Sequence, residues 1–332
     1  MIRLLGKRCA AMVAVLLFLA AVVFTLQNMT PTDPVHSFLG ANASKAAIKA
    51  ESHKLGYDKP LPQQYLHYVG GMLHGDFQMS LRTRRPVATD LRRYLPATLE
   101  LALFSLVLAA VLGGILGVVT AARFRGAGAF RLLTLAGAST PPFLLALVGI
   151  LLLYHKLHWL PATGRTSLAS PPSGPTGLLT VDTLLHGNLG GFTDAFRHLV
   201  LPGVCVAVLP AVSIGRVLRS SLVTTLRSDY VRTARAKGLR ELVVLWRHAI
   251  RNSLGPALSM GGLQVGLMFA GVVVIEQIFA WPGIGLYTVQ SIPRSDFPAI
   301  AGVTIVLGAG YVVVNTLVDL LQAVADPRIA MG

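Results

Sequence analysis

The acidic side chains near the apolar parts of this chain are few, and they lie far apart in the sequence. Glu100 opens one long uncharged stretch, Glu276 closes another, and Asp319 lies near the end of a third. Catalysis within such apolar stretches needs a nucleophile with its base, a pair of aspartates or a metal-binding set. The stretches contain no such combination, so we predict that the chain is not an enzyme. The three carboxylates are expected close to the membrane interfaces, where water can solvate them.

The cysteines and histidines of the sequence also give little support for a metal site or a reactive thiol. The two cysteines, Cys9 and Cys205, fall inside apolar stretches, where the surroundings oppose formation of a thiolate. The nine histidines form no HExxH pattern and no cluster with ligand spacing. We therefore predict no disulfide, no metal site and no cofactor bound by this chain.

The middle of every long apolar stretch also lacks the ionisable residue that an ion-coupled transporter usually places there. Gln264 and Asn315 offer the amide side chains within these stretches. If the chain moves a solute, its energy is therefore expected to come from another subunit.

The elements that position these side chains are predicted to be membrane-spanning helices. With 53% hydrophobic and 13% charged residues, the chain is too apolar for a water-soluble protein of 332 residues. A hydrocarbon core of about 30 Å takes roughly 20 helical residues to cross. Stretches free of Asp, Glu, Lys and Arg predict an all-α integral membrane protein with six transmembrane helices, at Cys9–Leu26, Leu101–Ala122, Leu132–Tyr154, Leu199–Gly215, Leu258–Ile275 and Ala299–Val318.

The basic residues predict the orientation of these helices. The formal net charge is +15, and Lys and Arg gather in cytoplasmic loops, beside anionic lipid head groups. We therefore place two basic loops in the cytoplasm and expect lipid, and no nucleic acid, to contact the charge. The first loop carries Arg123, Arg125 and Arg131; the second, residues 220–256, carries Arg227, Arg232, Arg235, Lys237, Arg240, Arg247 and Arg251.

Four segments follow from this orientation. Residues 1–29 form a cytoplasmic N-terminus and an uncleaved first helix, because no small-x-small cleavage pattern follows the apolar run. Residues 30–96 form an external segment despite their nine Lys and Arg, because long loops cross membranes largely regardless of charge. Residues 97–325 form a five-helix core that includes the cytoplasmic loop, and residues 326–332 form a cytoplasmic tail.

The basic loop at 220–256 contains a helical pattern of its own. Ser228 or Asp229 can cap a short helix that runs to Lys237, and Gly238 can end it in the left-handed conformation that glycine adopts cheaply. A second short helix is predicted at 241–251, with Leu242, Leu245, Trp246 and Ile250 on or near one face. Such a helix-turn-helix either docks onto another protein or lies on the lipid surface.

The loop sequence DYVRTARAKGL at 229–239, followed by RHAIRNSLGPAL, resembles the EAA motif of ABC-importer permease subunits, particularly those of the dipeptide, oligopeptide and nickel branch. The chain looks most like the first permease of a dipeptide importer. Further motifs of this family follow in order: DKPLPQQY at 58–65, GDFQMS at 75–80, LPATLEL at 95–101, RHLVLPG at 197–203, FAWPGIG at 279–285 and DPRI at 326–329. The resemblance covers nearly the whole chain and implies a type I ABC-importer permease fold.

The resemblance also implies a set of partners in a bacterial inner membrane, with both chain ends in the cytoplasm. These are a second homologous permease subunit, two ATPase subunits that bind ATP and Mg²⁺, and an external substrate-binding protein. This chain would form half of the pathway for di- or oligopeptides and couple ATP hydrolysis to their uptake.

An EAA-type coupling helix docks into a cleft on the ATPase, which implies a role for particular residues here. We expect ATPase coupling at Tyr230, Ala234, Arg235, Lys237 and Gly238. Ala234 and Gly238 are four residues apart and share a helix face, where small size permits close approach. Arg235 is expected to make an ionic contact.

The lining of the pathway is a separate expectation. A peptide with charged ends needs polar partners in an apolar channel, and Gln264, Glu276, Asp296 and Asn315 offer them. The same four side chains could instead satisfy neighbouring helices.

The sequence departs from the family pattern in three places. Arg232, Thr233 and Ala234 occupy the first three positions of the EAA motif, so its glutamate is absent. Gln78 stands where the usual GDxGxS motif has its second glycine, and Gly255 precedes Pro256 where the peptide branch usually has an aliphatic residue.

Other functions stay open at this point. Within the family, nickel or another small chelate could replace a peptide as cargo. Outside it, the chain could be an ion-coupled transporter acting alone, which would work without ATP or partner subunits. It could also be a membrane scaffold or sensor, which would transport nothing.

Overall fold

The computed structural model describes residues 2–29, 44–55, 58–121, 139–172 and 174–325, together with the single positions 128, 132 and 137. Within these residues the regular elements are all helices, and one isolated bridge joins Met79 to Pro86. The prediction of an all-α chain is therefore confirmed. The first predicted basic loop, much of the helix that follows it and the tail 326–332 lie outside the described residues.

The chain divides into two compact units. The first contains Met1–Leu95 and Gly283–Val312, and the second contains Pro96–Pro282 and Val313–Gly332. Two helices pass from one unit into the other, α5 (Val87–Ala121) and α14 (Phe297–Ala325).

The first unit has two small apolar cores. One joins α1 to α4 and α14 through Ala20, Val23, Tyr68 and Ala301. The other fixes the start of α5 against α13 and α14, through Val87, Leu91, Ile284, Tyr287, Ala299 and Val303. Apart from α5 and α14, the elements of this unit are α1 (Ile2–Met29), α3 (Lys45–Leu55), α4 (Leu61–Leu73), α13 (Ile284–Ser291) and the 3₁₀ turn η3 (Ile292–Arg294).

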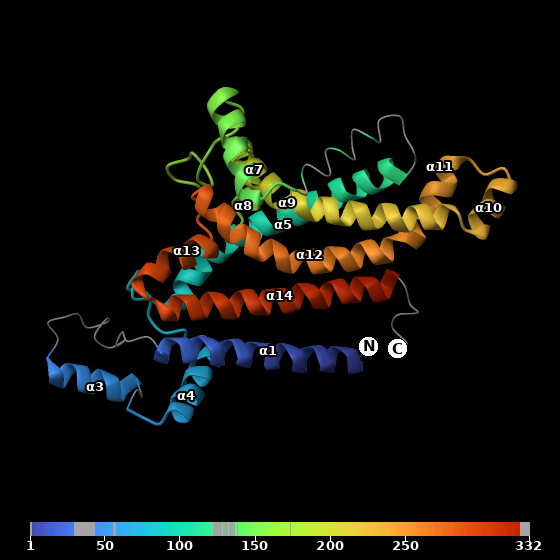
Figure 1. The fold of residues 1–332 in the computed structure, drawn as a ribbon. Coiled ribbons are helices and arrows are strands. Elements are labelled where there is room, and N and C mark those ends of the chain that lie inside the picture. Colours follow the sequence, from blue (N-terminus) through green and yellow to red (C-terminus); the bar gives the residue numbers. More distant parts are fainter. Residues whose placement is uncertain are drawn as a thin grey trace. The chain divides into compact units, whose positions relative to one another are not determined.

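The second unit is built on two long helices, α9 (Leu189–Leu226) and α12 (Arg251–Ile278), which lie side by side. Figure 1 shows α10 and α11 at one end of α9, and α7 and α8 near its other end. The remaining elements are α7 (Pro142–Gly149), the π-helical segment η1 (Ile150–Lys156), α8 (Leu179–Leu185), α10 (Asp229–Ala236), α11 (Glu241–Val243) and the π-helical segment η2 (Val244–Ile250).

Glycines let α5 approach α9 closely. A Cβ atom added to Gly113 would lie 2.8 Å from the Ala211 carbonyl oxygen, and one added to Gly117 would lie 2.8 Å from the Leu218 side chain. Membrane helices pack closely through small residues in this way, because lipid supplies no hydrophobic drive for their association.

Five helices in the described residues are long and apolar enough to cross a membrane. They contain the predicted fourth, fifth and sixth stretches, the first from Ala10 on and the second up to Ala121, where the described residues stop. Pro202 and Pro210 lie inside α9 without ending it. The predicted third helix, Leu132–Tyr154, is described only in part, and its apolar piece Pro142–Lys156 is shorter than a span. The count of six transmembrane helices therefore stays a prediction.

Candidate functional site

A helical hairpin, residues 227–250, connects the end of α9 to α12. Its first helix, α10, runs over Asp229–Ala236, as the sequence predicted. Ser228 occupies the position before the helix, but its hydroxyl donates to the Thr225 carbonyl oxygen at 2.6 Å and makes no capping bond to α10. The helix therefore starts without the side-chain cap that the sequence suggested.

The second helix of the hairpin does not end at residue 251, so that prediction is wrong. α11, η2 and α12 form one helical segment, Glu241–Ile278. Charge determines how deep a helical residue lies in a membrane, but it does not end a helix.

Gly238 forms the turn between the two helices of the hairpin. Its φ angle is +76°, in the left-handed region, and its N–H donates to the Arg235 carbonyl oxygen at 2.9 Å. A Cβ atom at this position would meet nothing within 4 Å. The predicted left-handed turn is confirmed, and it is the backbone conformation, not lack of space within this chain, that favours glycine here.

The hairpin has a small apolar interior. Val231 and Ala234 of α10 pack against Val244 and Leu226, and Ala234 is only 7% exposed. The side chain of Ala234 is therefore used inside this chain. Its small size lets the two helices of the hairpin approach each other, whereas Gly238 is exposed at the turn.

Arg235 is held in place by acceptors within the hairpin. Its Nε and Nη2 atoms donate to the two carboxylate oxygens of Glu241, at 2.7 and 3.1 Å, and Nη1 donates to the Leu226 carbonyl oxygen at 3.2 Å. The hydrogen bonds to Glu241 raise the pKa of the Arg235 guanidinium. The predicted ionic residue thus keeps its charge, but its main described partner is internal.

The outer face of the hairpin combines aromatic, aliphatic and basic side chains. Leu242 and Trp246 are 70% and 66% exposed, and the partly exposed Tyr230 accepts a hydrogen bond from Asn252 at 3.0 Å. The hairpin also carries exposed cations, at Arg232, Lys237, Arg240 and Arg247. Aromatic residues and arginine are enriched in protein interfaces, so this face has the composition of a docking surface.

At the other end of α9, Glu100 forms a buried ion pair. It is 5% exposed, and its carboxylate lies 2.6 Å from the Nη2 atom of Arg165. Thr180 donates to the same carboxylate through its N–H and its hydroxyl, at 2.7 and 2.6 Å. The expectation that water solvates Glu100 is therefore wrong, because the 157–178 loop covers it.

Two further carboxylates bind the same loop. Asp182 accepts hydrogen bonds from the hydroxyl and N–H of Thr176, at 2.7 and 3.2 Å. Asp194 accepts from the hydroxyl of Thr166 and from both the N–H and the hydroxyl of Ser167. The sequence did not predict that Glu100, Asp182 and Asp194 all bind this loop. The available signal was the presence of acidic residues near apolar stretches, because buried carboxylates need hydrogen-bond partners.

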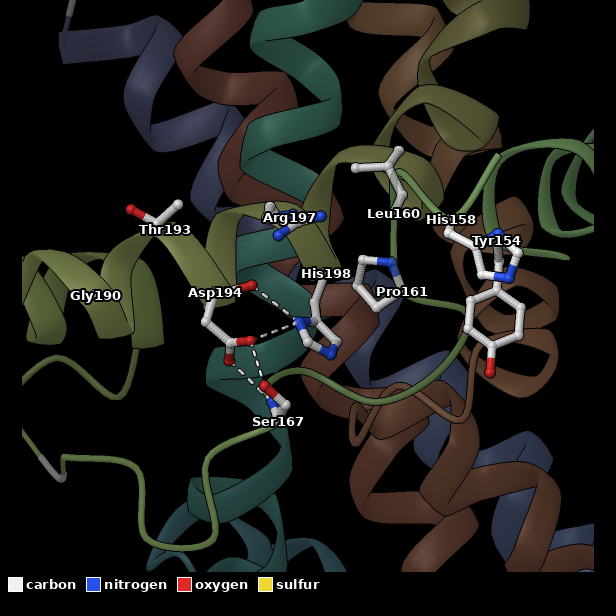
Figure 2. A pocket seen from close by; sticks show the side chains of 10 residues that line it. All are labelled: Tyr154, His158, Leu160, Pro161, Ser167, Gly190, Thr193, Asp194, Arg197 and His198. Carbon is white, nitrogen blue, oxygen red and sulfur yellow. Dashed lines mark hydrogen bonds and ion pairs between the residues drawn. The ribbon is translucent and has the colours of Figure 1, made fainter. Parts of the chain in front are cut away.

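A cavity of about 720 Å³ opens between this loop, the end of η1 and the start of α9. Figure 2 shows the Asp194–Ser167 pair on one side of it and Tyr154 with His158 on the other. Arg197 donates from Nη2 to the Trp159 carbonyl oxygen at 2.7 Å, and His198 contacts the Asp194 carbonyl oxygen through Nδ1. The lining residues are Tyr154, His158, Leu160, Pro161, Ser167, Gly190, Thr193, Asp194, Arg197 and His198.

The four residues expected to line a substrate pathway lie in separate surroundings. Glu276 is fully buried and accepts a hydrogen bond from Thr98 at 2.6 Å, so the expected solvation of this carboxylate is wrong. Gln264 lies on the same helix, near the Met260 sulfur, and Asn315 is half-buried on α14. The side chain of Asp319, the third acid expected in water, lies outside the described residues.

Asp296 belongs to the first unit and is also fully buried. Its carboxylate accepts from the Ser80 hydroxyl at 2.5 Å and from the Arg82 N–H at 3.1 Å, and it accepts from the Ala299 N–H at the start of α14. It therefore attaches the turn before α5 to α14. A role in the pathway stays a prediction for all four residues.

The turn at 76–87 explains the departure at Gln78. Its φ angle is +65°, a left-handed value in a non-glycine residue, and its N–H donates to the Asp76 carboxylate at 2.8 Å. Glycine adopts this conformation without the cost that a Cβ atom brings. The glycine that the GDxGxS pattern has at this position therefore matches the backbone seen here.

Arg82 and Tyr287 form a contact that the sequence did not predict. The guanidinium carbon lies 4.9 Å from the centre of the Tyr287 ring, and the Tyr287 hydroxyl donates to Asp90 at 3.1 Å. Burial raises the pKa of Tyr287, so the hydroxyl keeps its proton at neutral pH. This contact joins α13 to the turn before α5 within the first unit.

Comparison with known families covers almost the whole chain. Residues 94–331 match the family described as the inner-membrane component of binding-protein-dependent transport systems. Residues 1–102 match the N-terminal family of the same membrane components.

Curated relatives are similar over their full length. The probable D,D-dipeptide transport system permease protein of Escherichia coli K12 is 40% identical, with 99% of this chain and 98% of the relative covered. The di/tripeptide transport system permease protein of Pseudomonas aeruginosa UCBPP-PA14 is 39% identical, with 99% of each covered. The dipeptide transport system permease protein of E. coli K12 is 36% identical, again with 99% of each covered.

Proposed function

Because this chain belongs to the family of inner-membrane components of binding-protein-dependent transport systems, we propose that it is a permease subunit of an ATP-driven importer of di- or oligopeptides. The observation that carries the proposal is the similarity over full length to three peptide permeases. Those relatives favour a peptide over nickel or another chelate as the cargo.

The importer needs further subunits. We propose a second homologous permease subunit, two cytoplasmic ATPases that bind ATP and Mg²⁺, and a substrate-binding protein that delivers the peptide. This chain is then a non-catalytic subunit, because hydrolysis takes place on its partners. Two permease subunits together would enclose the pathway.

The hairpin at 227–250 is the proposed coupling element of EAA type. Its exposed basic and aromatic face supports this assignment, as does its attachment to the long helices α9 and α12. Tyr230, Lys237 and Gly238 are proposed to contact the ATPase directly. Ala234 and Arg235 are proposed to act by holding the hairpin in shape, since both contact residues of the hairpin itself.

A rigid hairpin can transmit motion in either direction. When ATP binding closes the two ATPases, each coupling hairpin is displaced, and the helices attached to it move with it. α9 and α12 leave the hairpin as continuous helices. The displacement would therefore reach the membrane-spanning part and switch the pathway between inward-open and outward-open states.

The proposed topology is that of a type I importer permease with six membrane-spanning helices. The hairpin and both chain ends then lie in the cytoplasm, and the 157–178 loop and residues 30–96 lie outside. Gln264, Glu276, Asp296 and Asn315 stay as proposed polar residues of the pathway. Residues 97–325 would form the permease core.

Uptake of a labelled dipeptide by vesicles tests the proposal. The chain is co-purified with the subunits that accompany it, and mass spectrometry identifies them. We expect a second permease and ATPases, and uptake that requires both ATP and the binding protein. Uptake driven by an ion gradient without ATP would support a self-sufficient transporter, and recovery of intact chain alone, without transport, would support a scaffold.

A further inference from the structure

The cavity beside Arg197 lies at the boundary between the apolar and polar parts of the chain. The uncharged stretch that ends at Tyr154 is followed by His155 and Lys156, and the stretch that begins at Leu199 is preceded by Arg197 and His198. Residues from both boundaries line this one cavity. In a membrane protein, such boundaries lie at the level of the lipid head groups.

The length of α9 places the cavity and the hairpin at opposite surfaces of the membrane. His198 lines the cavity, and Leu226 ends the helix before the hairpin, 28 residues further on. At 1.5 Å per residue this separation is about 42 Å. A bilayer with its head groups is about 40–45 Å thick, so both ends of this helical stretch reach a head-group layer.

Most of the N–H donors of Arg197 have no hydrogen-bond partner among the described residues. An arginine carries five N–H donors, and the described contact of Arg197 is the single bond to the Trp159 carbonyl oxygen. Among the described residues no ion pair joins Arg197 to a carboxylate. Asp194 lies one helical turn away, but its two oxygens already accept from Thr166 and Ser167.

Other groups around the cavity suit an amphipathic anion. His158 and the hydroxyl of Tyr154 lie across the cavity from Asp194 (Figure 2), and both can donate hydrogen bonds. Exposed apolar side chains continue from the rim along η1 and the loop, at Leu151, Leu152, Leu157 and Trp159. A ligand with a charged head and apolar tails would match both surfaces.

We propose that this cavity binds the phosphate group of an anionic phospholipid, with Arg197 as its main partner and His158 and Tyr154 as further donors. The acyl chains would lie along the exposed apolar face of η1. The lipid would hold the end of η1 and the 157–178 loop against α9. This inference requires that the chain crosses a membrane, but it does not depend on the cargo or on the partner subunits.

Quenching of Trp159 by brominated lipid tests the proposal. Trp159 is 62% exposed and contacts Arg197 through its carbonyl oxygen. The full-length chain, with the subunits it retains, is reconstituted in phosphatidylcholine vesicles that contain brominated phosphatidylglycerol or brominated phosphatidylcholine. The quenching that disappears in a Trp159→Phe variant belongs to this tryptophan and not to Trp246 or Trp281.

We expect the Trp159 quenching to require about fivefold less brominated phosphatidylglycerol than brominated phosphatidylcholine, which is the preference that one arginine near the surface gives. Arg197→Gln should remove this preference, and Arg197→Lys should restore part of it. Arg227→Gln is the matched control, because it removes the same charge at the other end of α9. It should leave Trp159 unaffected.

Two results would overturn the inference. Equal quenching by the two lipids in the parent protein, unchanged in Arg197→Gln, would show that no anionic lipid occupies the cavity. Relief of the quenching by inorganic phosphate or glycerol phosphate would assign the cavity to a soluble anion instead of a lipid. Helical circular dichroism of Arg197→Gln, compared with the parent, verifies that the variant is folded.

Discussion

Gln78 shows how a single backbone angle explains a departure in the sequence. Its left-handed conformation costs a non-glycine residue free energy. The motif pattern already indicated a glycine at this position, and the structure supplies the reason. The Gln78 N–H donates to the Asp76 carboxylate, and the Gln78 carbonyl oxygen accepts from the Val87 N–H. Both hydrogen bonds use backbone atoms of residue 78, which every residue type except proline carries, so the sequence could not indicate how the protein tolerates glutamine here.

The first prediction follows from this angle. Gln78→Gly should stabilise the protein by about 1 kcal/mol, because glycine adopts a left-handed conformation without the Cβ clash. Gln78→Val should destabilise it, because a β-branched side chain is a genuine outlier at positive φ. Thermal unfolding in detergent, followed by circular dichroism, measures both effects. A less stable glycine variant would mean that contacts of the Gln78 side chain outweigh the strain.

At the scale of elements, the hairpin was largely predictable and the 157–178 loop was not. The end of α10 depends on the left-handed turn at Gly238, so a local pattern identified it, although the predicted side-chain cap at its start is absent. The ion pair between Glu100 and Arg165 joins residues 65 positions apart, and helical periodicity carries no information about such pairs. The uncharged stretches indicated where the acids lie but not what covers them.

The second prediction concerns this buried ion pair. Glu100→Gln should cost about 3 kcal/mol, because it leaves the Arg165 guanidinium buried beside a neutral amide. The 157–178 loop should then detach from α5 more often, so trypsin should cleave after Arg165 faster in the variant than in the parent protein. The rate of appearance of the two fragments measures this opening.

An exposed ion pair provides the matched control. Glu241→Gln removes the same charge from a partner of Arg235, but this pair lies at the surface, where ion pairs contribute little. It should leave cleavage at Arg165 unchanged. Equal cleavage rates in the parent and in Glu100→Gln would contradict the view that this ion pair holds the loop.

The third prediction concerns the turn of the hairpin. Gly238→Leu should leave the protein inserted and folded, because a side chain at this position meets nothing in the chain itself. It should nevertheless abolish ATP hydrolysis stimulated by substrate, because the left-handed turn is strained and bulk is added to the docking face. The ATPase activity of the reconstituted importer, with and without binding protein and peptide, measures the loss.

Gly238→Asn separates the two causes. Asparagine tolerates the left-handed conformation better than leucine does, so this variant should keep the turn and much of the stimulated hydrolysis. Full coupling in Gly238→Leu would count against the hairpin as the ATPase-docking element. Loss of the assembled complex in both variants would show that the position is needed for assembly as well as for coupling.

At the scale of the whole molecule, composition predicted the class of protein because the physics of the bilayer is general. A lipid environment requires helices of roughly 20 apolar residues, and five such helices are present in the described residues. Composition could not predict that the helices continue well beyond the apolar stretches, as α9 and α12 do. The length of an apolar stretch reflects the thickness of the hydrocarbon layer, whereas the residues at which a helix begins and ends depend on capping and packing.

The fourth prediction is that six helices cross the membrane, with the hairpin on the same side as both chain ends. The hairpin region carries seven Lys and Arg at residues 227–251 against Asp229 and Glu241, and such an excess marks a cytoplasmic loop. Fusions of alkaline phosphatase, which is active only outside the cytoplasm, can measure the side of each point. Fusions after Ala325 or within the hairpin should be inactive, and a fusion at Gly174 should be active. An active fusion after Ala325 together with an inactive one in the hairpin would mean that the number of crossings between them is odd, and the proposed six-helix topology would then be wrong.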